Sequence, residues 1–354
     1  MIKKQYRVIG VMSGTSLDGV DLAYITFTKE RQWQFKIHVA ETISYTENWL
    51  GILKQLLHYD RNALRQIDAD YTKYLSTLIN QFIESNTIQN LDAVCSHGHT
   101  ALHQPEKGLT YQIGNLPILA KLINQTVVCD FRVADVALGG QGAPLVPIGD
   151  ELLFSNYDFC LNLGGFANIS TDIKGERLAY DICPVNIVLN HYIQTLGQNY
   201  DDKGQMAATG TVHQTLLDNL NALEFYQKTH PKSLGIEWVV KHIFPLIDSY
   251  KLSIADVLRT FTEHIAIQIA NEINAKQDAT VLITGGGAYH HFLIERLQWH
   301  TKNTLIIPDN LIVEYKEALI FGLLGVLKLR DEVNCLESVT GAKMNHSSGK
   351  IFNP

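Results

Sequence analysis

The chain has 354 residues, of which 46% are hydrophobic and 18% charged, and its formal net charge is −7. This composition is typical of a globular protein with enough apolar material for about two domains. The acidic balance without a basic cluster argues against a nucleic acid partner, and no apolar run approaches the roughly 18 residues that a membrane-spanning helix needs.

The first predicted element is a strand–turn–strand unit. Two apolar runs, Val8–Met12 and Val20–Phe27, are rich in the residues that favour strands. The turn between them combines glycines, hydroxyls and carboxylates, which suits a phosphate and its Mg²⁺. An ordinary hairpin whose Asp-Gly pair only makes the bend is the alternative interpretation. The positions concerned are Gly14, Thr15, Ser16, Asp18, Gly19 and Asp21.

The next elements alternate strands with amphipathic helices. Strands are predicted at Gln34–Ser44, Leu91–Ser96, Thr110–Gly114 and Gln125–Cys129, and helices at Leu50–Leu57, Asn62–Ile67, Tyr71–Ser85 and Leu116–Ile123.

Two polar segments in this half are predicted to be loops. The first, Ser96–His103, contains His97, His99 and His103, which could hold a metal, although neutral hydrogen bonding fits better because no carboxylate completes a ligand set nearby. The second, Asp130–Pro147, is long and glycine-rich, and loops of this length are usually functional. Its candidate ligand contacts are Arg132, Asp135 and Gln141.

A second hairpin follows the plan of the first. Asp158–Leu163 and Phe166–Thr171 read as strands joined by a turn at Gly164 and Gly165. The repeat predicts two lobes, each with one hairpin turned toward a shared cleft. A chance recurrence of a common turn is the alternative.

Asp181 and a triple glycine are the chemical candidates of the second half. Asp181 ends a short apolar segment and is a candidate general base, although an Asp before a turn is also a common helix cap or surface residue. Thr280–Thr284 is a predicted strand that runs into Gly285, Gly286 and Gly287. This turn could support an adenosine ring or could be a tight strand-to-helix connection.

The remaining elements of this half are predicted from their periodicity. Helices are expected at Ile187–Leu196, Thr211–Leu220, Ile236–Ile247, Ile254–Asn274, Phe292–Trp299 and Tyr315–Lys328, and a strand at Thr304–Ile307, with no clear element after Val333.

The five cysteines are scattered and form no C-x-x-C pair. This pattern is typical of reduced thiols in the cytoplasm and predicts neither a disulfide framework nor a zinc site. No segment matches the Walker A or GxGxxG spacing, so a nucleotide would have to bind differently.

At the level of motifs, the chain resembles the anhydro-N-acetylmuramic acid kinases along nearly its whole length. The matching segments, in order, are Gly10–Asp21, Ser96–Gly98, Gln112–Asn115, Asp130–Arg132, Gly139–Pro147, Asn162–Ser170, Pro231–Gly235, Gly285–Ala288 and Val339–Ala342.

The resemblance implies an α/β fold of the actin-like ATPase type, a duplicated ribonuclease H-like unit with central mixed sheets and flanking helices. It implies an N-terminal lobe of residues 1–155, completed by 330–354, and a C-terminal lobe of residues 156–329. The implied reaction uses ATP and Mg²⁺: water opens the 1,6-anhydro bond of the amino sugar and O6 takes the γ-phosphoryl group, giving N-acetylmuramic acid 6-phosphate in cell-wall recycling. Members are often homodimers, so a homodimer is left open.

Site residues follow from the resemblance position by position. Asp181 is the implied base, Thr100, Arg132 and Glu317 are implied sugar contacts, and Asp18 is the implied Mg²⁺ contact through the phosphates. The implied nucleotide site comprises Gly14, Thr15, Ser16, Leu17, Asp18, Gly19, Val20, Asp21, Gly164, Gly165, Gly285, Gly286 and Gly287.

The chain departs from the family's pattern after the base. Where members commonly carry Asp-Thr-Gly-Pro-Gly-Asn, this chain has Asp181-Ile-Cys-Pro-Val-Asn186, and His99 stands where Gln is frequent. The departure leaves open a related kinase for another amino sugar. A non-catalytic ATP-binding protein of the same fold is the third hypothesis.

Overall fold

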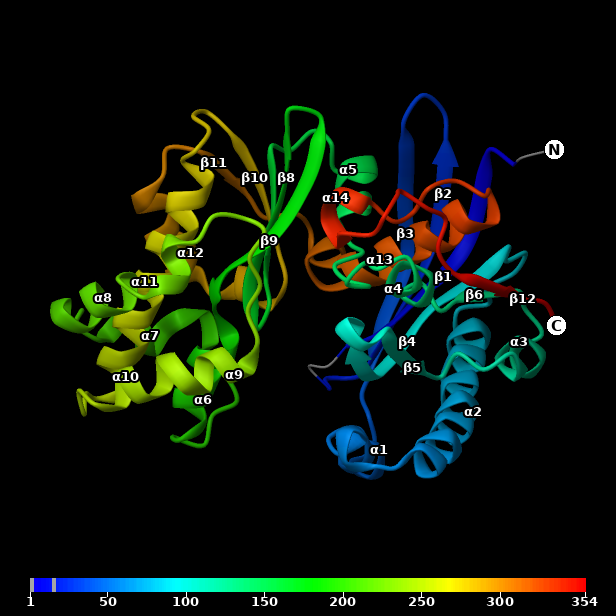
Figure 1. Cartoon of the computed structure of the whole chain (residues 1–354), viewed down its shortest axis with the longest axis horizontal. Coiled ribbons are helices and arrows are strands. Elements are labelled where there is room, and N and C mark those ends of the chain that lie inside the picture. The colour runs from blue at the N-terminus through cyan, green and yellow to red at the C-terminus, as the bar shows by residue number, and fades with distance from the viewer. Residues whose placement is uncertain (1–2, 15–16) are drawn as a thin grey trace. The chain divides into compact units, whose positions relative to one another are not determined.

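The structure is a computed structural model, and it describes residues 3–14 and 17–354. The chain forms two compact units, of which unit 1 comprises Met1–Phe154 and Tyr315–Pro354 and unit 2 comprises Ser155–Glu314 (Figure 1). The second boundary lies within helix α13 (Asn310–Leu329), at the non-helical Tyr315, whereas the sequence led us to expect it after residue 329.

Unit 1 is built on a mixed sheet in the order β12-β6-β4-β1-β2-β3, with β5 paired to β4. The first three strands are antiparallel neighbours, β4 is parallel to β1, and β6 is parallel to β4. The strands are β1 (Gln5–Ser13), β2 (Val20–Lys29), β3 (Trp33–Ile43), β4 (Ala93–Gln104), β5 (Leu109–Ile113), β6 (Val127–Cys129) and β12 (Lys350–Phe352).

Helices pack on both faces of this sheet, which explains why β1 is almost continuously buried. The long α2 (Arg61–Ser85) is capped at its N-terminus by Asp60, whose carboxylate accepts hydrogen bonds from the backbone amides of Asn62 and Ala63. Helix α13 approaches β1 so closely that a Cβ on Gly10 would lie 1.9 Å from the Ala318 carbonyl oxygen. The other helices of unit 1 are α1 (Glu47–Leu53), α3 (Ile118–Ile123), α4 (Val133–Ala137), α5 (Pro147–Leu153) and α14 (Glu337–Thr340).

Unit 2 repeats this strand arrangement. Its sheet has the order β11-β10-β7-β8-β9, in which β7, β8 and β9 are antiparallel neighbours and β10 and β11 continue in parallel from β7. The strands are β7 (Phe159–Leu163), β8 (Phe166–Ile173), β9 (Glu176–Pro184), β10 (Thr280–Thr284) and β11 (Thr304–Ile306).

Most helices of unit 2 lie between β9 and β10. They are α6 (Asn186–Gln194), α7 (Gln205–Thr209), α8 (Gln214–Asn221), α9 (Ile236–Trp238), α10 (Phe244–Asp248) and α11 (Ile254–Ile273), and α12 (His291–His300) follows β10. Helix α11 supplies much of the core, because Phe261, Ile265 and Ile269 are fully buried in the cluster that also contains Leu161 and Ile283 of the sheet.

Both sheets therefore place three antiparallel strands first and two parallel strands after them, in the spatial order 3-2-1-4-5. This is the ribonuclease H-like order, and its occurrence twice in one chain is the duplicated unit of actin-like ATPases. The predicted fold class and the predicted hairpin in each unit, β1–β2 and β7–β8, are confirmed.

Several predicted boundaries were wrong. The polar segment Ser96–His103 belongs to β4, residues 61–85 form one helix, and the loop after Asp130 contains α4. The C-terminal tail also forms elements, since α14 lies within it and β12 pairs antiparallel with β6. Among the described residues, no helix combines the length and apolar character required to cross a bilayer.

Candidate functional site

The turn between β1 and β2 carries the predicted phosphate loop. Thr15 and Ser16 lie outside the described residues, while Leu17 has a φ of 62° and donates its N–H to the Gly14 carbonyl at 3.3 Å. Gly19 has no room for a side chain, because a Cβ would lie 2.5 Å from the Ile43 carbonyl oxygen. Asp18 is exposed at the turn, and Val20 is buried as the first residue of β2.

Asp21 lies on β2, one position beyond Val20, and is half-buried. Its carboxylate accepts a hydrogen bond of 2.7 Å from the Thr42 hydroxyl on β3. The Thr42 hydroxyl lies 3.4 Å from the Tyr315 hydroxyl. The neighbouring strand and α13 thus orient this carboxylate beside the turn.

A buried polar cluster supports the start of the same turn, and sequence analysis did not identify it. The Ser13 hydroxyl is 2.8 Å from Tyr71 Oη and 2.8 Å from His99 Nδ1, and it also bonds Tyr45. Burial lowers the pKa of His99 to about 4, so its imidazole is neutral at pH 7. The residues that precede Gly14 are therefore fixed by hydrogen bonds from β3–α1, α2 and β4.

Arg132, a predicted sugar contact, is held by two acceptors. Its Nε donates to His97 Nε2 at 2.9 Å, and its Nη1 donates to the Gly142 carbonyl at 2.7 Å. His97 in turn donates from Nδ1 to the Gly98 carbonyl, which fixes a neutral tautomer. Burial and the neighbouring Arg132 charge keep the pKa of His97 well below its usual value.

The other two predicted sugar contacts also lie in unit 1. Glu317 lies on α13. Burial raises the pKa of its carboxyl and lowers the pKa of Arg132 to about 10, and the attraction between the two charges partly offsets both shifts. Thr100 is half-buried on β4, three residues beyond His97, where it pairs with Gln112 of β5. The structure thus couples Arg132 to Glu317 and places Thr100 on the strand that holds Arg132.

Asp135, expected from its loop position to contact a ligand, is turned into the protein interior. It is fully buried, and its carboxylate accepts the Thr340 hydroxyl at 2.7 Å and the Gly142 amide at 2.7 Å. Gln141 has an exposed side chain, and its backbone N–H donates to the Thr340 carbonyl at 2.8 Å.

The three histidines of the first polar segment do not gather around a metal. His97 bonds Arg132, His99 bonds Ser13, and His103 bonds Thr110 at 3.1 Å. Neutral hydrogen bonding, the interpretation that the sequence favoured, is confirmed for His97 and His99.

In unit 2 the predicted nucleotide glycines come together. The carbonyls of Gly164 and Gly165, in the β7–β8 turn, accept the amides of Asn186 and Val185 at 3.2 and 2.8 Å. The Asn186 side chain donates to the Leu163 carbonyl at 3.3 Å. The β7–β8 turn is thereby joined to the start of α6.

The triple glycine packs against the same turn. Gly285 has a φ of 83°, and a Cβ there would lie 2.5 Å from Asn162 Oδ1. A Cβ on Gly287 would lie 2.7 Å from the Leu163 Cβ, whereas Gly286 is exposed and its nearest neighbour would be Asn186 Nδ2 at 3.8 Å. Two of the glycines are therefore required for packing, and Gly286 leaves an open backbone surface.

Asp181 lies inside β9, rather than at the end of a strand as expected, and pairs with Asn168 of β8. Its Oδ2 accepts the Leu234 amide at 2.8 Å, and its own amide donates to the Lys232 carbonyl at 3.0 Å. Burial raises the pKa of Asp181 and the Leu234 amide partly offsets that rise. A half-buried carboxylate with a raised pKa and one oxygen fixed by an amide is a suitable general base.

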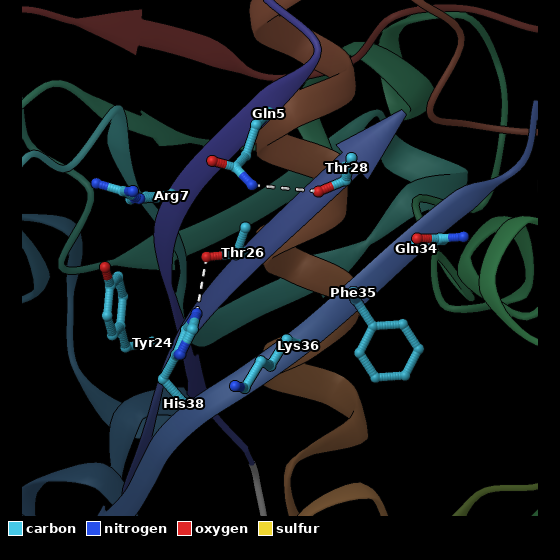
Figure 2. A pocket seen from close by; sticks show the side chains of 9 residues that line it. All are labelled: Gln5, Arg7, Tyr24, Thr26, Thr28, Gln34, Phe35, Lys36 and His38. Atoms are coloured by element: carbon cyan, nitrogen blue, oxygen red, sulfur yellow. Dashed lines mark hydrogen bonds between the residues drawn. The ribbon is translucent and has the colours of Figure 1, made fainter. Parts of the chain in front are cut away.

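A pocket of about 440 Å³ lies on β1–β3, and none of the predicted site residues lines it. Figure 2 shows its polar side chains along the three strands, with Thr26 bonded to His38 at 2.8 Å. Its lining residues are Gln5, Arg7, Tyr24, Thr26, Thr28, Gln34, Phe35, Lys36 and His38.

Comparison with known proteins agrees with the motif resemblance. The family model for anhydro-N-acetylmuramic acid kinase matches residues 6–354. Relatives named anhydro-N-acetylmuramic acid kinase include one from Mannheimia succiniciproducens, 36% identical over 99% of this chain and 100% of its own, and one from Haemophilus influenzae, 32% identical over 99% and 98%.

Among solved structures, component A of the (R)-2-hydroxyglutaryl-CoA dehydratase of Acidaminococcus fermentans has a TM-score of 0.48 at 12% identity, over 92% of this chain and 99% of that one. By the extent of the family match and the identity to its relatives, the chain belongs to the anhydro-N-acetylmuramic acid kinase family.

Proposed function

We propose that this protein is an ATP-dependent kinase that hydrolytically opens 1,6-anhydro-N-acetylmuramic acid and phosphorylates O6. The observation that carries the proposal is the family match across residues 6–354. The Asp181 carboxylate, oriented by the Leu234 amide, supports the hydrolytic half of the reaction.

The proposed chemistry begins with water. Asp181 takes a proton from a water molecule, whose oxygen forms a bond to the anomeric carbon C1 while the C1–O6 bond breaks. The electron pair released on O6 attacks the γ-phosphorus, and ADP leaves with the electrons of the broken P–O bond. The raised pKa of Asp181 makes it a stronger base than an ordinary aspartate.

The phosphate loop, Gly14–Asp21, is the proposed holder of the triphosphate. Its two glycines allow close approach of phosphate to the backbone, and the exposed carboxylate of Asp18 is an oxygen ligand of the kind that Mg²⁺ prefers. When bound, Mg²⁺ would neutralise charge on the phosphates. The glycines at 164–165 and 285–287 are the proposed support for the rest of the nucleotide, with Gly286 offering open backbone.

Arg132 is the proposed anchor of the sugar, with Thr100 and Glu317 as further contacts. A guanidinium has five donors, and the two bonds to His97 and Gly142 leave others for sugar or carboxylate oxygens. The lactyl carboxylate of a muramic acid is a natural partner for this fork.

The departure from the family pattern at residues 182–185 does not favour a different sugar. Ile182, Cys183 and Val185 are at most 1% exposed, so the bulk that replaces the family's glycines lies in the core. The plain anhydro sugar is accordingly the proposed substrate, ahead of another amino sugar or a purely binding role.

The test is the product formed from ATP, Mg²⁺ and the anhydro sugar in ¹⁸O-labelled water. We expect N-acetylmuramic acid 6-phosphate with one ¹⁸O at C1 and none in the phosphate, because water attacks carbon and O6 attacks phosphorus. Label in the phosphate would mean that water attacks ATP instead, and absence of any sugar phosphate would contradict the proposal.

Asp181→Asn tests the base. We expect turnover to fall by about 10²–10⁴-fold, since general base catalysis is worth that much, with little change in the binding of sugar. The matched control is Asp218→Asn, an exposed carboxylate on α8 of the same unit. Wild-type turnover in Asp181→Asn would show that another group activates water.

A further inference from the structure

A carboxylate, a thiol and an imidazole meet in unit 1, away from the turn that carries the phosphate loop. The ligand atoms of Asp135, Cys335 and His346 all lie within 4.8 Å of one another. Within the described part of the chain, these three residues form the one cluster of His, Cys, Asp or Glu side chains that could hold a metal ion. Asp135 is fully buried and Cys335 is 1% exposed. The His346 side chain is 10% exposed.

The backbone explains why these residues meet. Cys335 and His346 face each other in an isolated antiparallel bridge, with N–H···O bonds of 3.1 and 3.2 Å in the two directions. Directly opposed residues in such a pair project their side chains to the same side. Asp135, on α4, approaches from that side, and its Oδ1 lies 3.0 Å from Cys335 Sγ.

The imidazole of His346 carries the second, independent observation. Its Nδ1 is 3.1 Å from the Met344 carbonyl, which requires the proton on Nδ1. Its Nε2 is buried and, among the residues described, has no hydrogen-bond partner. Asp135 Oδ1, which has no proton to donate when ionised, lies 3.7 Å away. The unpartnered nitrogen lone pair therefore faces a negatively charged oxygen in a buried site, an arrangement that suits a cation between the two atoms.

The distances from Asp135 Oδ1 to the other two ligand atoms are close to what a small ion needs. Ligand atoms at about 2.0–2.3 Å from a tetrahedral ion lie roughly 3.3–3.8 Å apart. The Nε2–Oδ1 separation of 3.7 Å already falls in this range, and the Sγ–Oδ1 separation of 3.0 Å has to widen slightly. Mixed sulfur, nitrogen and oxygen ligands favour zinc over Mg²⁺ or Ca²⁺.

We propose that Asp135, Cys335 and His346 bind one Zn²⁺ ion, with water as the fourth ligand. Binding releases the thiol proton to solvent, and the thiolate and carboxylate then balance the two charges of the ion. The Gly142 amide, which donates to the other carboxylate oxygen, Oδ2, at 2.7 Å, and the Thr340 hydroxyl, which donates to Oδ1 at 2.7 Å, orient the carboxylate. The ion joins the C-terminal segment to α4.

The site connects with the proposed sugar anchor. Asp135 accepts the Gly142 amide at 2.7 Å, and the Gly142 carbonyl accepts Arg132 Nη1 at 2.7 Å. The zinc ligand and the arginine are therefore two hydrogen bonds apart, and the ion has a structural role in fixing the loop that orients Arg132.

The experiment uses the full chain, stripped with a chelator and assayed without nucleotide so that no triphosphate holds the probe. Titration with Co²⁺ should produce a near-ultraviolet thiolate-to-cobalt absorption band at one ion per chain, and Zn²⁺ should abolish that band by displacement. Zn²⁺ should also raise the Tm of the stripped protein.

The variants Cys335→Ser and His346→Gln identify the ligands. Cys335→Ser should lose the thiolate band and His346→Gln should weaken Co²⁺ binding at least tenfold, whereas Cys160→Ser, which removes a buried thiol in β7 of unit 2, should retain both. The proposal would be overturned if the stripped wild-type protein shows no thiolate band with Co²⁺, a result that does not depend on how any variant folds. It would also be overturned if the band persists in Cys335→Ser.

Discussion

Arg132 illustrates how a single side chain is fixed for a proposed task. Its two acceptors, His97 Nε2 and the Gly142 carbonyl, engage different nitrogens of one planar group. A lysine carries the same charge on a single nitrogen, so it cannot reach both acceptors and also present a fork to a carboxylate.

We therefore expect Arg132→Lys to raise the KM for the anhydro sugar by about 10–100-fold, since a hydrogen bond to a charged group contributes about 1.5–3 kcal/mol. The KM for ATP should change little. Arg65→Lys, on the exposed face of α2, is the matched control. Steady-state kinetics with each substrate varied in turn measure this, and an unchanged sugar KM would remove Arg132 from the site.

Sequence patterns propose site residues where the residue type itself carries the chemistry. Asp181 and Arg132 are candidates because carboxylates and guanidinium groups in otherwise unexplained positions are conspicuous, and their roles stay predictions. Ser13 and the Leu234 amide were missed because their significance depends on partners far along the chain, at Tyr71 and Asp181. The burial of Asp135 was not predicted because its partners, Cys335 and Thr340, lie 200 and 205 positions away.

At the scale of elements, the turn after β10 separates two uses of glycine. Gly287 is buried against Leu163, and Gly286 faces open space. The triple glycine thus contains one position where packing requires a glycine, Gly287, and one where packing does not require it, Gly286.

Alanine at the two positions should separate stability from nucleotide binding. Gly287→Ala has to displace Leu163 and should destabilise the protein by about 1–3 kcal/mol, as overpacking does. Gly286→Ala should leave stability within about 0.5 kcal/mol of wild type and raise the KM for ATP severalfold. Urea unfolding and ATP kinetics on both variants decide this, and a Gly286→Ala enzyme with unchanged ATP kinetics would place the nucleotide elsewhere.

The error at Ser96–His103 has a physical explanation at this scale. Polar residues in sequence suggest a loop, but in β4 each buried polar group has a partner, such as Ser13 for His99 and Arg132 for His97. The periodicity and polarity of a sequence cannot reveal these distant hydrogen-bond partners. Thr280–Thr284, a strand of ordinary apolar composition, was predicted with the correct bounds.

For the whole molecule, buried histidines should govern the response to acid. Burial lowers the pKa of His99 to about 4 and of His264 to about 3, from an ordinary value of 6.5. The unfolded chain therefore binds protons at these sites that the folded chain does not. The stability that they contribute is complete above pH 6.5 and is lost as the pH falls from 6.5 toward 4 for His99 and toward 3 for His264.

Each such histidine steepens the pH dependence of the free energy of unfolding by up to about 1.4 kcal/mol per pH unit. Urea unfolding midpoints between pH 7.5 and 4.5 measure this dependence, and His99→Gln should make the pH dependence of the stability of unit 1 shallower. His58→Gln, an exposed histidine of the same unit, should not. Identical slopes for the two variants would mean that His99 is not a neutral buried group.

The duplicated strand order has a consequence for how this protein could be redesigned. The two sheets share one plan, but the chain between the third and fourth strands spans residues 44–92 in unit 1 and 185–279 in unit 2. The longer crossover supplies Lys232 and Leu234, which contact Asp181. To change the substrate specificity of the enzyme, both sheets should be kept and residues of the longer crossover varied, because the crossover differs between the two units while the strand order is the same in both.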